Sequence, residues 1–126
     1  MILGIGIDIV VFDQMESACK KQEKFYEYLL TKAEIKSYQD LNSEKKIQFL
    51  ASRFAVKEAF SKAMGTGIGK KVNFQNITVL DNEKEQATIV ESPFDGKSFV
   101  SISHSKSMLI AQVVLEKNKN ESNSLC

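Results

Sequence analysis

The spacing of apolar residues changes along the chain and separates a helical first half from a strand-rich second half. Over residues 43–64 apolar positions recur every three to four residues, which predicts one long helix. Asn42 or Ser43 can cap its start, and Gly65 can end it. The apolar stripe expected on this helix consists of Ile47, Leu50, Ala51 and Phe54.

Shorter helical segments precede the long helix. Residues 12–28 predict one or two short helices. Thr31 and Glu34 have the spacing of a capping box, which predicts a helix from Thr31 to about Gln39.

The N-terminal segment 2–11 is rich in β-branched residues and apolar at nearly every position, which predicts a strand buried on both faces. Gly4 and Gly6 predict that a neighbouring backbone or a ligand approaches this strand closely. Asp8 interrupts the apolar run. It is either a strand-end aspartate or a member of a charged site.

Four short runs of strand-forming residues follow the long helix, separated by polar turns. The runs lie at 77–80, 87–90, 98–103 and 108–115. Helices first and strands later predict an α+β fold with a mainly antiparallel sheet. We expect residues 1–117 to form a single domain and residues 118–126 to be a disordered polar tail.

The composition changes this picture little. With 126 residues, 43% hydrophobic and 26% charged, the chain is typical of a globular domain, and its net charge of +1 argues against a dedicated nucleic-acid binder. No run reaches the ~20 apolar residues of a membrane span, and no signal-peptide pattern is present. Cys19 and Cys126 lack metal-ligand spacing, so we expect reduced thiols and a cytoplasmic location.

Glu58 continues the apolar stripe of the long helix, and Lys62 follows one turn later. A carboxylate on a buried face is costly unless a cation or a metal ion pairs with it. Together with Asp8, these side chains favour Mg²⁺, which prefers oxygen ligands. The alternative is an exposed Glu58–Lys62 pair on one helix face, worth ~0.3–0.5 kcal/mol.

Other polar segments are less specific. Residues 65–71 are rich in glycine but lack the spacing of a phosphate-binding P-loop, so they predict a helix end and a turn. His104, the only histidine, has a serine-rich flank suited to a phosphate or nucleotide edge, although a lone histidine is more often structural. A small basic cluster suits either a solvated face or an acidic partner, and it comprises Lys20, Lys21 and Lys24.

Four motifs, in order along residues 1–117, resemble holo-acyl-carrier-protein synthase, the small bacterial type of 4′-phosphopantetheinyl transferase. They are Gly4-Ile5-Gly6-Ile7-Asp8, the helix segment 49–63, the glycine-rich segment 65–69, and Val100-Ser101-Ile102-Ser103-His104-Ser105. The resemblance implies transfer of the 4′-phosphopantetheine group from coenzyme A to a serine of apo-acyl carrier protein, for fatty acid biosynthesis. The by-product is adenosine 3′,5′-bisphosphate.

The resemblance also implies the roles of individual residues. Asp8 and Glu58 are similar to the family's Mg²⁺ ligands, and Glu58, directly or through a water, is the candidate base for the carrier serine. Lys62 would neutralise or protonate the departing phosphate. The expected coenzyme A-binding residues are Arg53, Lys62, His104 and Ser105, and the basic cluster 20–24 is expected to dock the carrier protein.

The family enzyme is a homotrimer with active sites between subunits, which would explain how so short a chain encloses coenzyme A. Two departures from the family pattern concern carrier docking and nucleotide binding. Gln14 stands where a basic residue that contacts the carrier is usual, and the turn 82–86 lacks the usual glycine and proline near the adenine.

Two other hypotheses remain at this point. The chain could be a trimeric module that holds coenzyme A or a phosphorylated nucleotide without chemistry. Alternatively, Glu58 and Lys62 could form a buried ion pair that fixes an oligomer register.

Overall fold

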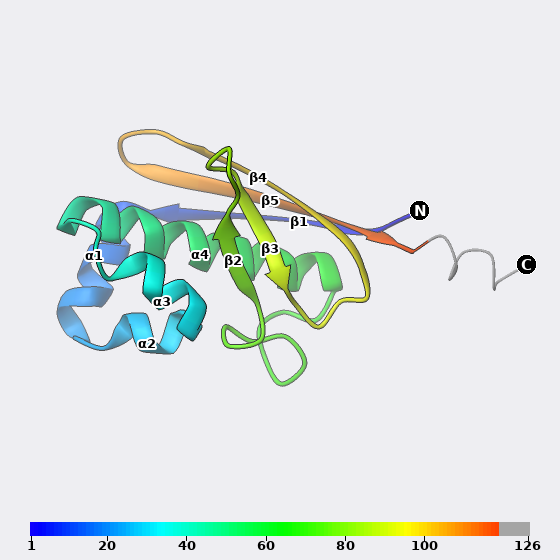
Figure 1. Ribbon diagram of the computed structural model, residues 1–126, viewed down its shortest axis with the longest axis horizontal. Helices are drawn as coiled ribbons and strands as arrows, with labels where there is room; N and C mark the ends of the chain where they lie inside the picture. Colours follow the sequence, from blue (N-terminus) through cyan, green and yellow to red (C-terminus); the bar gives the residue numbers. More distant parts are fainter. Residues whose placement is uncertain (119–126) are drawn as a thin grey trace, which may run out of the picture.

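The computed structural model describes residues 1–118, and the expected tail lies almost wholly outside this range. A single long helix, α4, occupies the centre of the fold (Figure 1). The elements along the chain are β1 (Ile2–Val11), α1 (Phe12–Lys21), α2 (Phe25–Leu29), α3 (Lys32–Tyr38), α4 (Ser43–Met64), β2 (Thr78–Asp81), β3 (Ala87–Glu91), β4 (Gly96–His104) and β5 (Met108–Lys117).

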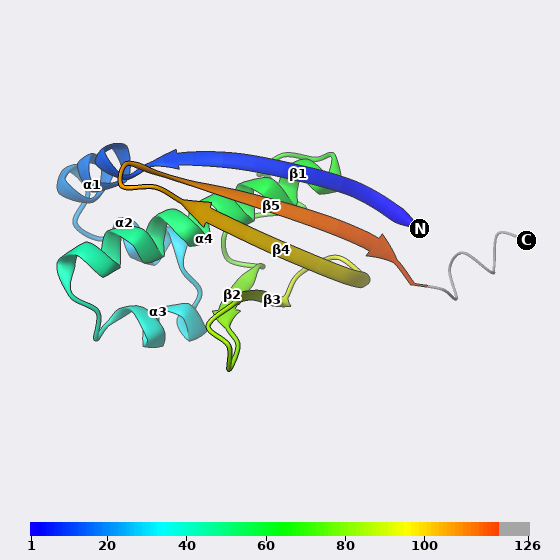
Figure 2. The same ribbon diagram turned by 90° about the horizontal axis from the view of Figure 1, so that it is seen from above.

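The strands form two antiparallel sheets, where one sheet was expected. A long sheet in the order β1-β5-β4 covers one side of α4, and β2 and β3 form a separate hairpin beside it (Figures 1 and 2). Helices α1 to α3 gather around the N-terminal half of α4. The α+β class and the antiparallel pairing are therefore confirmed.

Helix boundaries follow local chemistry closely. The Asn42 side chain accepts a hydrogen bond from the Lys45 amide at the start of α4, and Gly65 ends the helix in a left-handed conformation with φ +79°. The capping box is present at α3, where Thr31 and Glu34 exchange backbone-to-side-chain hydrogen bonds. The predicted starts and ends of these two helices hold to within a residue.

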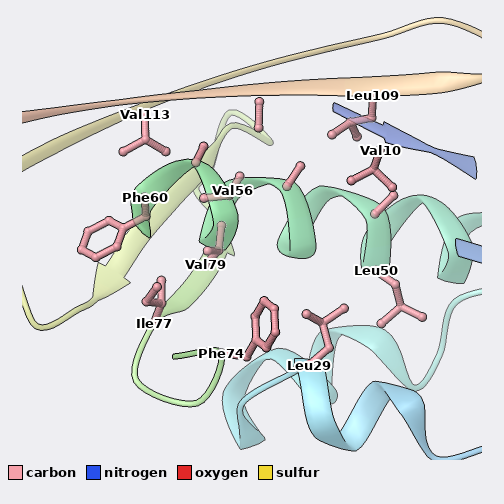
Figure 3. Close-up of a cluster of buried hydrophobic side chains, with 14 of the residues drawn as sticks. Val10, Leu29, Leu50, Val56, Phe60, Phe74, Ile77, Val79, Leu109 and Val113 are labelled. Carbon is pink, nitrogen blue, oxygen red and sulfur yellow. The ribbon is translucent and has the colours of Figure 1, made fainter. Parts of the chain in front are cut away.

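Because α4 is covered on several sides, it is buried nearly all round rather than along one stripe. Figure 3 shows Val10, Leu109 and Val113 packing from the long sheet onto one side of the helix. Leu29, Phe74 and Ile77 pack from the opposite side. The core is therefore continuous through the helix.

Strand β1 lies directly against α4, as its glycines predicted. A Cβ added at Gly4 would lie 1.9 Å from the Ala63 carbonyl oxygen, and one at Gly6 would lie 1.8 Å from that of Ala59. Neither distance is tolerable for a side chain, so only glycine permits this spacing. The close approach brings the next inward-facing residue of β1, Asp8, onto the helix surface.

The opposite face of β1 is exposed, so the prediction of a strand buried on both sides is wrong for the single chain. Ile5, Ile7 and Ile9 are each more than half exposed. Register places Ile5 beside Val114 of β5 and Val114 beside Phe99 of β4, so the apolar face extends across the sheet. Within residues 1–118 no helix is long and apolar enough to cross a membrane.

Candidate active site

Asp8 of β1 and Lys62 of α4 meet where the strand crosses the C-terminal half of the helix. The Lys62 ammonium donates to Asp8 Oδ1 and to the Ile7 carbonyl oxygen, each at 3.0 Å. The Asp8 side chain is 16% exposed and that of Lys62 is 51% exposed, so the pair lies at the boundary of the protein and solvent. Lys62 pairs across to the strand, and no Glu58–Lys62 ion pair forms among the described residues.

The second oxygen of Asp8 has no hydrogen-bond partner. Asp8 Oδ2 is buried, and it is the sole buried side-chain polar atom within residues 1–118 left without one. An unsatisfied buried oxygen of this kind costs ~1–3 kcal/mol, more when it is charged. A fold that leaves this particular atom unpaired presents an acceptor to a ligand.

Glu58 adds a second carboxylate beside Asp8. Burial raises the pKa of Glu58, the Asp8 charge raises it further, and Lys62 opposes both effects. Two carboxylates therefore lie near a single lysine, which leaves excess negative charge for a cation to neutralise. No cluster of three or more histidine, cysteine or acidic residues occurs in the described chain, so a metal ion here would take its remaining ligands from water or substrate.

The reason given for Glu58 from the sequence needs correction. Within the expected stripe Leu50 and Ala51 are fully buried, whereas Phe54 and Glu58 are the least buried residues between Phe49 and Ser61. The periodicity failed because α4 packs on more than one side. Glu58 nevertheless lies at the site, since its edge of the helix runs beside β1.

Arg53 lies in a separate cleft of about 800 Å³ between α4, β4 and the β2–β3 turn. Its Nε donates to the Val79 carbonyl oxygen at 3.1 Å, and its Nη2 pairs with Asp81 Oδ1 at 3.2 Å. The guanidinium carbon lies 3.9 Å from the centre of the Phe49 ring. Burial lowers the pKa of Arg53, although Asp81 favours its charged form.

The structure brings His104 into the same cleft as Arg53 but leaves Ser105 outside the cleft lining. Ser105 Oγ accepts hydrogen bonds from the amides of Ser107 and Met108, at 3.3 Å each, and so shapes the β4–β5 turn. The expected coenzyme A contact of Ser105 stays a prediction, and its side chain already has a local role.

The two charged regions do not join within one chain. Glu58 follows Arg53 by five residues, a rotation of about 140° around the helix axis, so the two side chains leave different sides of α4. None of Asp8, Glu58 and Lys62 lines the Arg53 cleft.

The basic cluster lies at and just after the end of α1. Lys20 pairs with Glu16 one turn earlier at 3.5 Å, and both side chains are largely exposed. Lys21 and Lys24 are exposed as well. The three lysines thus form a solvated surface available to a partner.

A buried ion pair between α4 and α3 was not predicted from the sequence. Lys57 and Glu34 are both fully buried, and the Lys57 ammonium donates to Glu34 Oε1 at 2.7 Å and to the carbonyl oxygens of Leu29 and Phe74 at 2.8 Å. Burial lowers the pKa of Lys57, and Glu34 opposes this shift. The available signal was a lysine within the otherwise apolar run Ala55-Val56-Lys57.

The family model that matches this chain and its similar relatives point to the same family. The family model of the 4′-phosphopantetheinyl transferase superfamily matches residues 4–116. A holo-[acyl-carrier-protein] synthase of Enterococcus faecalis is 48% identical over 116 residues, which cover 92% of this chain and 98% of that protein. One from a Geobacillus species is 44% identical over 117 residues, with 93% and 98% coverage.

Solved structures of similar proteins share the fold. A Bacillus anthracis holo-(acyl-carrier-protein) synthase in complex with CoA (3′,5′-ADP) matches with a TM-score of 0.86 and 43% identity, covering 94% of this chain and 99% of that one. A Helicobacter pylori holo-[acyl-carrier-protein] synthase in complex with coenzyme A matches with a TM-score of 0.78 and 36% identity, covering 89% and 99%.

Proposed function

The chain belongs to the 4′-phosphopantetheinyl transferase superfamily, and we propose that it is a holo-acyl-carrier-protein synthase. It transfers the 4′-phosphopantetheine group of coenzyme A to a serine of an apo-acyl carrier protein, for fatty acid biosynthesis, and releases adenosine 3′,5′-bisphosphate. The observation that most supports this function is the unpaired, buried Asp8 Oδ2 beside Glu58 and Lys62. We assign the activity to one domain over residues 1–117, in the cytoplasm.

Mg²⁺ fits the donor set of this site. Asp8 and Glu58 would hold the ion, which when bound supplies positive charge to the pyrophosphate of coenzyme A. Phosphoryl transfer depends mainly on positioning and charge neutralisation, so a site with two oxygen ligands and open positions suits it.

The chain's own side chains handle the protons and the remaining charge. Glu58, directly or through a water, accepts the proton of the carrier serine hydroxyl as a general base. Lys62 is held by Asp8 and the Ile7 carbonyl, and its remaining N–H group can donate to the departing phosphate. Arg53 and His104 bind the nucleotide end in their cleft.

A homotrimer with shared active sites accounts for the two separate regions. In our proposal the Asp8 region of one copy faces the Arg53 cleft of the next, so that coenzyme A spans both. The exposed apolar face of Ile5, Ile7 and Ile9, continued by Phe99, supports burial against another copy, because apolar side chains gathered on one exposed face mark interaction sites. The exposed lysines at and just after the end of α1 would dock the acidic carrier.

Intact-mass spectrometry tests the reaction. Apo-acyl carrier protein incubated with the enzyme, coenzyme A and Mg²⁺ should gain the mass of one phosphopantetheine group, and EDTA should prevent the gain. Glu58→Gln should lose activity, whereas Glu44→Gln, the same change at the exposed start of the same helix, should retain it. Absence of transfer to several carrier proteins, with coenzyme A still bound, would instead favour the binding-only module.

Mixing two inactive variants tests the shared site. Asp8→Asn and Arg53→Ala lie in different regions, so trimers assembled from both variants should contain some interfaces with two intact halves. Co-refolded mixtures should regain a fraction of the wild-type activity, while each variant alone stays inactive. Mixtures as inactive as the separate variants would place both regions in the site of one copy.

A further inference from the structure

The Arg53 cleft has an unexpected charge balance for the site of a nucleotide. Within one chain its lining contains two basic side chains, Lys45 and Arg53, and two carboxylates, Asp81 and Glu85. These four formal charges cancel. Coenzyme A and adenosine 3′,5′-bisphosphate are polyanions, so a cleft built for maximal affinity would contain excess positive charge.

Asp81 contributes most directly to this balance, because it contacts the cation itself. Asp81 Oδ1 accepts from Arg53 Nη2 at 3.2 Å, and the Asp81 side chain is 50% exposed while that of Arg53 is 5% exposed. The carboxylate therefore approaches the guanidinium from the solvent side, the side from which a ligand phosphate must also arrive.

Arg53 does not need Asp81 to hold its position. Val79 accepts from Nε at 3.1 Å and Ser52 Oγ accepts from Nη1 at 2.9 Å. The Phe49 ring supports the guanidinium plane. With Asp81 included, three of the five N–H groups have acceptors within the described chain, which leaves two for a ligand.

We propose that Asp81 competes with an anionic nucleotide for Arg53. The nucleotide must displace the Asp81 carboxylate or bind beside its repelling charge. This competition promotes departure of the nucleotide product. The inference rests on the proposed function and concerns the nucleotide affinity of that same site. Asp81 acts through Arg53 and takes no part in the bond changes. It therefore lowers the affinity for coenzyme A and for adenosine 3′,5′-bisphosphate together.

Asp81→Asn tests this role, because it removes the charge and keeps an oxygen acceptor of the same shape. We expect the KM for coenzyme A and the inhibition constant of adenosine 3′,5′-bisphosphate each to fall about two- to fivefold, the range of a partly exposed charge pair. The KM for the carrier protein should not change. The effect should shrink at high salt, since added ions screen an exposed charge.

Two matched variants serve as controls, one for charge and one for position. Asp81→Glu keeps the charge and should stay near the wild-type KM. Asp40→Asn makes the same substitution at an exposed residue outside the cleft lining and should have no effect on nucleotide affinity. An unchanged or raised KM in Asp81→Asn would overturn the proposal, because it would mean that Asp81 positions Arg53 instead of competing for it.

Calorimetry with adenosine 3′,5′-bisphosphate separates this inference from the proposed function. Tighter binding by Asp81→Asn supports the competitor role even if wild-type protein transfers no phosphopantetheine group, in which case only the proposed function fails. Equal binding by variant and wild type, with transfer intact, refutes the competitor role alone.

Discussion

Helix α4 holds two lysines in ion pairs, and the two pairs differ in burial and in how many of their polar atoms have hydrogen-bond partners. The Lys57–Glu34 pair is fully buried, and Lys57 has three acceptors. The Glu34 carboxylate also accepts from the backbone amides of Thr31 and Val79. The Lys62–Asp8 pair lies near the surface, and one Asp8 oxygen has no partner. In the first pair, called saturated here, the charged groups have hydrogen-bond partners, and the pair connects segments of the fold. In the second pair, called unsaturated, one carboxylate oxygen lacks a partner and can bind a ligand.

Removing one member of the saturated pair should have the largest effect on stability. Lys57→Met leaves Glu34 charged, buried and without its cation, so we expect a loss of about 3–5 kcal/mol in the free energy of unfolding. Urea titration measures it. The double variant Lys57→Met/Glu34→Gln should lose less than the single variant, because it removes the unpaired charge and keeps a side-chain acceptor for a backbone amide. A single-variant loss below ~1 kcal/mol would contradict the structural role.

Asp8→Asn should give the opposite result, with a large effect on function and a small one on stability. We expect the rate of transfer to fall at least about a hundredfold, or ~2.7 kcal/mol of transition-state stabilisation. The free energy of unfolding should change by less than ~1 kcal/mol, because Lys62 keeps the Ile7 carbonyl.

A readout other than activity sharpens the same comparison. Mg²⁺ should raise the thermal midpoint of the wild type by binding the folded state, and should not raise that of Asp8→Asn. Asp40→Asn should respond as the wild type does. If Mg²⁺ stabilised Asp8→Asn equally, Asp8 would not be a metal ligand.

Gly6→Ala tests how far the unsaturated pair depends on the approach of β1 to α4. The new Cβ would lie 1.8 Å from the Ala59 carbonyl oxygen, so the strand must move away from the helix. We expect a loss of about 1–3 kcal/mol in unfolding free energy, together with reduced transfer as Asp8 shifts from Lys62. Gly69→Ala, where an added Cβ meets open space, is the matched control and should be neutral.

The smallest expected effect is a pH dependence of the free energy of unfolding that comes from Glu58. Its pKa in the folded chain is raised, so folding favours its protonated form. The resulting destabilisation is absent below the ordinary glutamate pKa and develops as pH rises from there through the raised value. Glu58→Gln cannot titrate, so in metal-free buffer it should be slightly more stable than the wild type at neutral pH and lose that advantage in acid. Parallel pH dependences of stability would contradict the raised pKa.

Local features of this fold were predictable from the sequence, and non-local ones were not. The caps at Asn42, Thr31 and Gly65 act over a few residues, so they fixed the ends of α3 and α4. By contrast, Lys57 meets Glu34 across 23 positions, and a spacing pattern carries no information about such a pair. Only packing decides which of two neighbouring charged residues on a helix, Lys57 or Glu58, points into the core.

The candidate site follows the same division. Asp8 and Glu58 were identifiable as carboxylates in apolar surroundings and through the family resemblance, but Glu58 was assigned to the wrong part of the helix surface. The pairing of Arg53 with Asp81 depends on how β2 lies beside α4, so no local pattern could predict it. The β1 strand was expected to be buried on both faces because apolar composition does not distinguish a core from an assembly surface.

The exposed apolar face of β1 also affects how the activity depends on the concentration of the protein. If active sites exist only between copies, a folded chain alone is inactive, and the number of active sites depends on the concentration of chains that can associate. At concentrations where free chains predominate, doubling the amount of chain would raise the amount of trimer up to about eightfold. The activity in the cell would then rise steeply with the amount of this protein synthesised. In a strongly diluted sample, the measured activity would depend on the fraction of assembled trimer more than on the rate of the chemical step.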